Sequence, residues 1–156
     1  MTEAPRPGAG RRWPEPARRP DPVVRASWAG TAVLAVASAV AVAAGSARPV
    51  AVAAALALNL AGVLVFFWAY AIAVNRSRTD AIGIGGLFFL AGEVAPAGVR
   101  RSLRWALAAQ VGVAVAAAAA RPYTAVAFGI LAPLFGLSLM GLWGARHGHF
   151  EARGPA

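Results

Sequence analysis

The chain has 156 residues, of which 59% are hydrophobic and only 13% are charged. Soluble domains usually contain about 45–50% apolar and about 25% charged residues, so this balance is typical of a membrane protein. The net charge is +9, and all fifteen basic residues are arginine. Arginines beside apolar segments follow the positive-inside rule, so we assign them to membrane topology and exclude nucleic-acid binding. The chain has no cysteine, which excludes disulfides and Cys-ligated metals.

The first 25 residues are rich in proline and arginine. They hold six of the eleven prolines and six of the fifteen arginines. Such a composition cannot bury a core, so residues 1–25 are predicted to form a disordered cytosolic tail. The pair Arg11–Arg12 resembles a twin-arginine signal, but Pro14 and the long apolar segment that follows argue against cleavage.

Four apolar segments follow, and each is long enough to cross a membrane. About 20 helical residues, at a rise of 1.5 Å each, span about 30 Å of hydrocarbon. The predicted transmembrane domain covers 26–146, with spans near 26–47, 50–74, 99–120 and 123–145, and a cytosolic tail at 147–156. Ala-Arg-Pro at 47–49 recurs at 120–122, each time between two spans. The predicted fold is therefore all-α, a four-helix transmembrane bundle made of two helical hairpins.

The arginines also predict which side of the membrane each loop occupies. The N-terminal tail holds six, the middle loop five and the C-terminal tail two, whereas each short turn holds one. This distribution predicts a multi-pass protein of the plasma (inner) membrane with both termini in the cytosol. Each span carries one tryptophan toward the same side, where tryptophan prefers the membrane–water interface. These residues are Trp28, Trp68, Trp105 and Trp143.

The middle loop contains an apolar segment, 81–92, that is too short to span a membrane. We predict an interfacial or re-entrant segment, with Asp80 as the N-cap of a helix that begins at Ala81. Residues 88–90, Phe-Phe-Leu, are expected to be buried against the bundle or the headgroup layer. Leaving such side chains in water would forgo about 1.5–3 kcal/mol each.

The second half of the chain resembles a known group of proteins. It contains GGLFFLAG at 85–92, VRRSLRWALAAQ at 99–110 and TAVAFGILAPLFGLSLMGLWGARHGHF at 124–150. In these sequences the chain, from about Arg76 to Phe150, is similar to small four-span hypothetical membrane proteins of high-GC actinobacteria. The resemblance implies a four-span fold and a membrane location, and it implies no activity, cofactor or functional residue.

The sequence contains no recognisable catalytic constellation. None of the six carboxylates lies inside a predicted span, whereas proton-coupled transporters usually carry an ionisable group there. Glu93 is interpreted as a loop acid that neutralises nearby arginines. His147 and His149 lack a third ligand close in sequence and lie outside the spans, which argues against a metal site and an intramembrane hydrolase. We therefore predict no catalytic, cofactor-binding or metal site, and no enzyme.

A structural polar layer is predicted inside the bundle. Ser38, Asn59 and Gln110 each lie about 15–17 Å from the nearest turn at 1.5 Å per residue. Pro133 lacks an N–H, so the carbonyl of Gly129 loses its α-helical partner. Gln110 is therefore expected to donate to this carbonyl or to pair with Asn59. We interpret the layer as helix–helix glue, with solute binding as the alternative.

Arg100, Arg101 and Arg104 lie on about one helical face and are predicted to contact anionic lipid headgroups. Each such contact contributes about 1 kcal/mol. The leading hypothesis is a noncatalytic accessory or scaffold component of a membrane complex, with a membrane-protein partner or a homo-oligomer. The alternative is a small transporter or channel-like oligomer.

Overall fold

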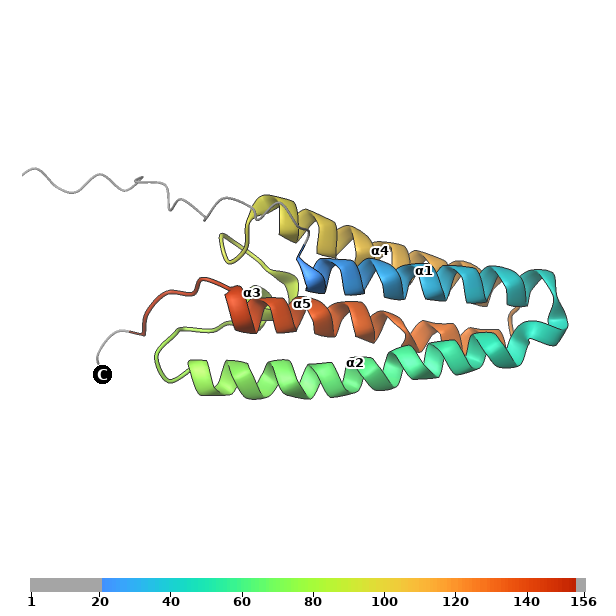
Figure 1. Cartoon of the computed structure of the whole chain (residues 1–156), viewed down its shortest axis with the longest axis horizontal. Coiled ribbons are helices and arrows are strands. Elements are labelled where there is room, and N and C mark those ends of the chain that lie inside the picture. Colours follow the sequence, from blue (N-terminus) through green and yellow to red (C-terminus); the bar gives the residue numbers. More distant parts are fainter. Residues whose placement is uncertain (1–20, 154–156) are drawn as a thin grey trace, which may run out of the picture.

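The computed structural model describes residues 21–153, which form an all-α bundle and confirm the predicted fold class (Figure 1). Its four long helices are α1 (Pro22–Ala43), α2 (Arg48–Arg76), α4 (Ala97–Ala120) and α5 (Pro133–His147). The shorter elements are α3 (Ile84–Phe89) and the 3₁₀ helices η1 (Gly45–Ala47) and η2 (Ala125–Leu131). Four helical segments, the last of them η2 joined to α5, are long and apolar enough to cross a bilayer. The protein is therefore a multi-pass membrane protein.

The bundle has two distinct ends (Figure 1). α1 begins and α5 ends at the end that also carries α3, which we call the termini end. The connections α1–α2 and α4–η2 lie at the opposite end, which we call the turn end. The main packing joins the two hairpins to each other, because α2 packs most extensively on α5, and α1 on α4.

α1 begins inside the segment that was predicted to be a disordered tail. Asp21 Oδ1 accepts a hydrogen bond from the backbone N–H of Val23 at 2.8 Å, and Pro22 occupies the first turn. An acidic N-cap followed by proline is a strong helix start, and it outweighs the polar composition around it. The predicted tail boundary at residue 25 is therefore wrong, whereas residues 1–20 lie outside the described residues.

α2 is longer than its predicted span of 50–74. Arg48 and Pro49, which were expected to form the turn, instead lie in the first turn of a 29-residue helix. Proline is favoured there because the first helical N–H groups have no partner to lose. The chain reverses through η1 instead.

The fourth span is not one continuous α-helix. The 3₁₀ helix η2 leads to Ala132, and α5 begins at Pro133. Proline excludes a normal α-helical bond at this point, and a 3₁₀ turn replaces it, with Ala132 N donating to Gly129 O at 3.1 Å. The carbonyl that was expected to be orphaned is thus satisfied locally.

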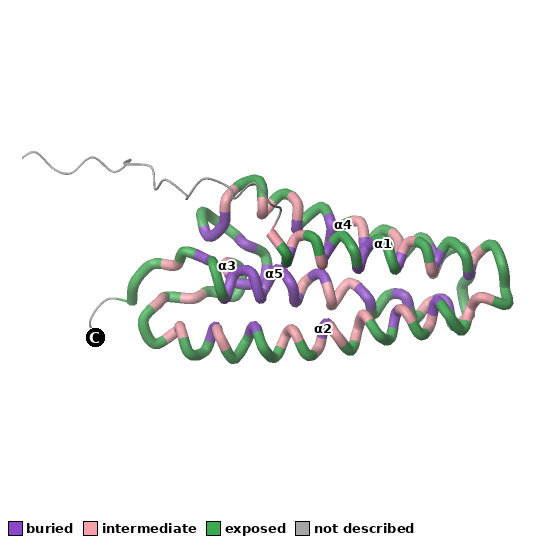
Figure 2. Tube along the Cα trace, viewed as in Figure 1, coloured by how far each residue is buried: buried purple, intermediate pink, exposed green. Residues whose placement is uncertain are grey.

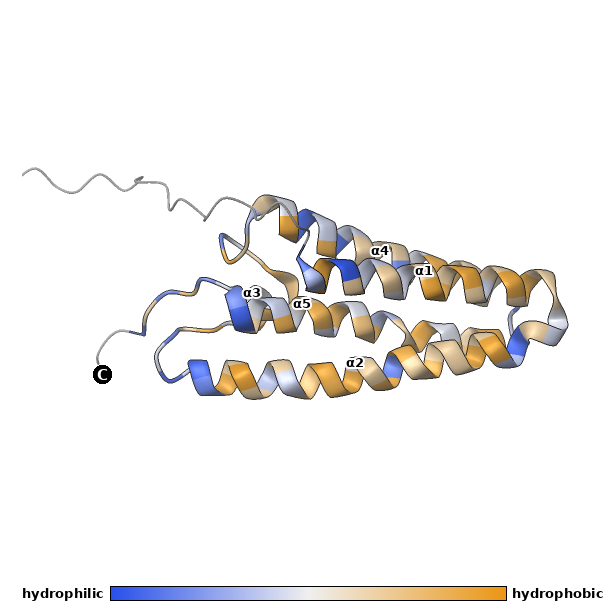
Figure 3. Ribbon diagram, viewed as in Figure 1, coloured by the Kyte–Doolittle hydropathy of each residue, from blue (hydrophilic) through white to orange (hydrophobic). Residues whose placement is uncertain are grey.

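α5 is the central helix of the bundle. Among the four spans, the one formed by η2 and α5 is the most buried, and the one formed by η1 and α2 is the least buried (Figure 2). Glycines allow the close approach. A Cβ at Gly62 would lie 2.8 Å from the backbone N of Phe135, and one at Gly141 would lie 2.5 Å from the ring of Phe88. The remaining surfaces of the spans are apolar and face outward (Figure 3).

Three of the four tryptophans in the spans are exposed, as an interface position requires. Trp28, Trp68 and Trp105 have exposed fractions of 43%, 58% and 65%. Trp143 is only 4% exposed, and its Nε1 donates to Asp21 Oδ2 at 2.8 Å. Its predicted role as an interface anchor is therefore wrong, because the indole joins the end of α5 to the N-cap of α1.

The short helix α3 lies at the termini end and packs on α5 (Figure 1). It begins at Ile84 with Gly83 as N-cap, so the predicted capping role of Asp80 is wrong. Phe88 and Leu90 are buried as predicted, and Phe88 stacks on Phe66 with ring centroids 5.0 Å apart. The side chain of Phe89 is about half exposed, so it is not buried against the bundle, and its burial in the headgroup layer stays a prediction.

Candidate functional site

Three of the five buried polar side chains in the described residues meet between α1 and α4. Gln110 is 1% exposed, and its Nε2 donates to the carbonyl of Ser27 at 3.2 Å and to Thr31 Oγ1 at 3.1 Å. The Thr31 hydroxyl in turn lies 2.9 Å from Ser27 O and 3.3 Å from Ala106 O. These contacts satisfy polar groups that lipid could not, so they join the two helices. We call Ser27, Thr31 and Gln110 the polar cluster.

The predicted partners of Gln110 are wrong. A helical side chain leans toward the N-terminus of its helix, and α4 begins at the termini end. Gln110 therefore reaches toward Ser27 and away from Gly129, whose carbonyl already accepts from Ala132. Its carboxamide lies beside Gly136, where a Cβ would come within 2.7 Å of Oε1.

The other residues of the predicted layer do not join the cluster. Asn59 is half-buried on α2, while Ser38 is buried on α1 about 16 Å farther along the helix than Ser27. Depth alone placed them with Gln110. The layer failed for two reasons. α1 ends at Ala43, so Ser38 lies nearer the turn end than a count from Arg48 indicates, and depth does not fix which helix face Asn59 occupies. Pro133 is the first residue of α5, and it has no N–H that could contribute to the cluster.

Two atoms of the polar cluster are buried without a hydrogen-bond partner among the described residues. They are Ser27 Oγ and Gln110 Oε1. An unpaired buried polar atom costs about 1–3 kcal/mol, so in natural proteins such atoms are usually paired with water or with another polar group. The break between η2 and α5 lies on a neighbouring span, and broken helices next to polar groups also occur in solute-binding sites of transporters.

We expect Gln110 and Thr31 to be energetically coupled. In a double-mutant cycle with Gln110→Ala and Thr31→Val, the coupling energy should be about 0.6 kcal/mol, with about 1.7 as the upper bound for such membrane contacts. Stability is measured by unfolding in mixed detergent micelles. The matched cycle of Gln110→Ala with Asn59→Ala should be additive, and coupling in the second cycle alone would contradict the observed geometry.

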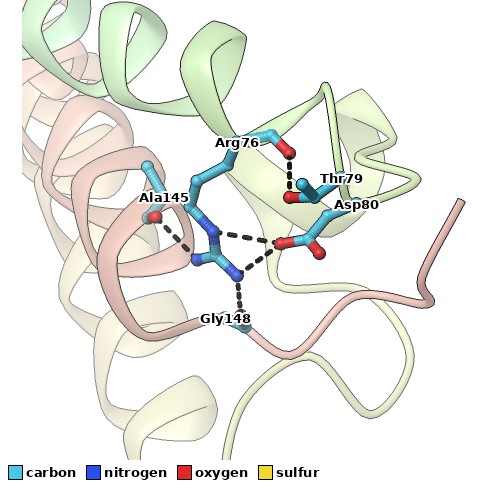
Figure 4. Close-up of polar contacts among 5 residues, drawn as sticks. All are labelled: Arg76, Thr79, Asp80, Ala145 and Gly148. Atoms are coloured by element: carbon cyan, nitrogen blue, oxygen red, sulfur yellow. Dashed lines mark hydrogen bonds and ion pairs between the residues drawn. The ribbon is translucent and has the colours of Figure 1, made fainter.

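At the termini end, the guanidinium of Arg76 joins three segments of the chain (Figure 4). Its Nη2 and Nε donate to Asp80 Oδ2 at 2.8 and 3.1 Å. Nη1 donates to the carbonyl of Ala145 at 2.8 Å, and Nη2 also donates to that of Gly148 at 3.1 Å. Carbonyls at a helix C-terminus lack intrahelical partners and carry partial negative charge. Arg76 therefore caps α5, from the last turn of α2.

The residues after α5 pack on the loop between α2 and α4. We call 147–153 the C-terminal segment and 77–96 the middle segment, and together they form the termini-end surface. An antiparallel bridge pairs Asp80 with Ala152. Three backbone hydrogen bonds of 2.7–3.1 Å join the two segments: Ala81 N to Glu151 O, Arg153 N to Thr79 O, and His149 N to Val94 O. The described part of the predicted C-terminal tail is thus an ordered part of the fold.

The three arginines predicted to contact lipid differ in their surroundings. Arg100 Nη1 donates to the carbonyl of Gly92, and Arg104 Nη2 donates to that of Phe89 at 2.8 Å. Arg101 is exposed. Two of the three thus hold the middle segment against α4, a role that their sequence spacing did not indicate. Their contact with anionic lipid stays a prediction.

A cavity of about 740 Å³ lies between the middle segment, the start of α4 and the C-terminal segment. Its charged and titratable lining residues are Glu93, Arg100, His149 and Glu151. Val94 and Phe150 contribute apolar walls. The sequence did not predict this cavity, because its walls come from segments up to 70 residues apart that only the backbone pairing brings together.

Comparisons with protein families, curated proteins and solved structures gave no match to this chain.

Proposed function

We propose that this protein is a noncatalytic accessory or scaffold component of a membrane complex, and that the termini-end surface is where it binds its protein partner. The observation that carries the proposal is the fixation of this surface. The middle and C-terminal segments have little regular secondary structure, yet they are held in one conformation by Arg76, by the Asp80–Ala152 bridge and by the backbone bonds between them. A surface that is ordered before binding loses less conformational entropy when a partner binds.

The charges of the termini-end surface also support a docking role. Arg78, Glu93 and Glu151 are exposed on it, and so is the apolar side chain of Ile84. Charged groups around an apolar contact are typical of interfaces, where they set orientation and association rate. The turn end presents a contrasting surface, with Arg121 holding the carbonyl of Val42 and Tyr123 fully exposed.

The proposal places the termini-end surface in the cytosol, on the basis of the arginine distribution and the positive-inside rule. The chain has no cysteine, so single cysteines can report the orientation directly. In intact cells, an impermeant thiol reagent should label Ser46→Cys and Thr124→Cys and should leave Ser77→Cys unlabelled. Labelling of Ser77→Cys alone would show that the orientation is the opposite one, and equal labelling of all three would indicate dual insertion.

Photo-crosslinking tests the docking function. A photoreactive phenylalanine analogue replaces Arg78 or Ile84 on the termini-end surface, and Tyr123 at the turn end serves as the matched control. Both termini-end positions should give one and the same adduct by mass spectrometry, and the adduct should disappear when Arg76→Ala is added. No adduct, or the same adduct from Tyr123, would contradict the proposal. An adduct of twice the chain mass would identify the partner as a second copy.

The polar cluster favours transport as the second candidate function, because Ser27 Oγ and Gln110 Oε1 are buried without partners in the described chain. Transport requires water access to this depth from at least one side. Ser27→Cys should resist a water-soluble thiol reagent if the protein is a docking component. Labelling of Ser27→Cys at a rate like that of Ser46→Cys would favour the transporter.

A further inference from the structure

The cavity at the termini end lies at the depth of the lipid headgroups. Arg100 on α4 lines it, and the exposed Trp105 follows five residues later, about 7.5 Å farther along the helix. Exposed tryptophans mark the boundary between headgroups and hydrocarbon. The cavity therefore lies on the headgroup side of this boundary.

The charges that line the cavity select a ligand that carries both signs. Arg100 supplies a guanidinium, whereas Glu93 and Glu151 supply two carboxylates. A ligand with negative charge alone would meet two carboxylates, and one with positive charge alone would meet the arginine. A phosphate bound to the arginine and an ammonium bound to the carboxylates would satisfy both sets of charges.

The position of Arg100 is fixed by the protein. Its Nη1 donates to the carbonyl of Gly92, which holds the side chain against the cavity wall. A guanidinium has five N–H donors, so this bond leaves enough donors for two parallel bonds to a phosphate. Carboxylates accept hydrogen bonds from a primary ammonium, whereas a trimethylated ammonium has no N–H to donate.

We propose that this cavity binds the headgroup of a phospholipid that carries a phosphate and a primary ammonium, the phosphoethanolamine headgroup. Arg100 binds the phosphate, and Glu93 and Glu151 accept from the ammonium. The acyl chains lie along the apolar surface of the bundle beside α4. This lipid site shares Glu93 and Glu151 with the termini-end surface, but it needs only the bilayer, so lipid binding can be tested on the purified protein without a protein partner.

Native mass spectrometry of the full-length protein in mild detergent tests the proposal. Phosphatidylethanolamine, phosphatidylglycerol and phosphatidylcholine with identical acyl chains are added in turn. Phosphatidylethanolamine should bind about tenfold more tightly than the other two, the ratio expected from losing one charge-assisted contact. Arg100→Gln should weaken the binding of all three lipids, because each of them carries the phosphate. Arg78→Gln makes the same charge change at an exposed arginine outside the cavity lining and should leave binding unchanged.

Two further variants keep the result interpretable. Arg100→Lys retains the charge and should restore part of the binding, which separates phosphate recognition from collapse of the middle segment. Glu93→Gln together with Glu151→Gln should abolish the discrimination against phosphatidylcholine. Equal binding of all three lipids, or a preference for phosphatidylglycerol, would overturn the proposal. Soluble phosphoethanolamine binding as tightly as the lipid would overturn the lipid assignment in favour of a soluble ligand.

Discussion

Replacing Arg76 with alanine should release the C-terminal segment from the bundle. The substitution removes the ion pair with Asp80 and the hydrogen bonds to the carbonyls of Ala145 and Gly148. Hydrogen bonds to charged groups contribute about 1.5–3 kcal/mol, which corresponds to a 10- to 100-fold increase in local opening. Hydrogen exchange should report this increase at the amides of Ala81, His149 and Arg153, which bond across the two segments.

The control lies two residues farther along the chain, just after the end of α2. Arg78 is exposed, and Arg78→Ala removes the same charge without removing the contacts of Arg76. It should leave the exchange of these amides unchanged. Arg76→Lys keeps the charge, but a lysine ammonium lacks the planar fork of donors with which the guanidinium bonds several acceptors at once. Its effect should therefore be intermediate. If Arg76→Ala and Arg78→Ala behaved alike, net charge and not the cap would hold the segment.

Replacing Gly62 with alanine should destabilise the bundle at its main interhelical contact. The new Cβ would lie 2.8 Å from the N and 2.9 Å from the Cα of Phe135. Both are backbone atoms, so α2 and α5 would have to separate, and the packing between them would weaken. We expect a loss of about 1–3 kcal/mol in unfolding free energy, the usual cost of overpacking. Unfolding in mixed micelles measures it.

Gly112 provides a matched control for this substitution. It also lies inside a spanning helix, but apart from its chain neighbours and the backbone of its own helix no heavy atom comes within 4 Å of a Cβ built there. Gly112→Ala should therefore cost nothing, and reduced backbone entropy should make it neutral or slightly stabilising. A comparable loss in both variants would mean that glycine is needed in these helices for a reason other than contact between α2 and α5.

The four-span architecture could be predicted from the sequence because apolar length and charge position are enough to define spans. Contacts were harder to predict. The choice of Gly129 as the partner of Gln110 assumed that proline leaves an orphaned carbonyl, but a 3₁₀ turn supplies Ala132 N as donor. Assigning Trp143 to the lipid interface relied on its depth, whereas its helix face turns it into the core toward Asp21.

The termini-end surface escaped prediction for a different reason. Arg76 and Asp80 have the spacing of a helical ion pair, which was visible in the sequence. The remaining contacts join residues about 70 positions apart. Their acceptors are the backbone carbonyls of Ala145 and Gly148, and because every residue has a carbonyl, residue type does not reveal them. The same backbone pairing forms the cavity, so the sequence could not show which walls and which charged residues it brings together.

The central helix α5 is also the last span of the chain, and this order has a consequence for biogenesis. Each span can enter the bilayer alone, because an apolar helix satisfies its own backbone. The groove at Gly62 and the acceptor at Asp21 Oδ2 nevertheless receive their partners, Phe135 and Trp143, only when the final span is synthesised. Until then the first three helices lie in the membrane without their common core. Packing of these helices therefore waits for the synthesis of η2 and α5, and a chain that stopped before Pro133 would be inserted but unpacked.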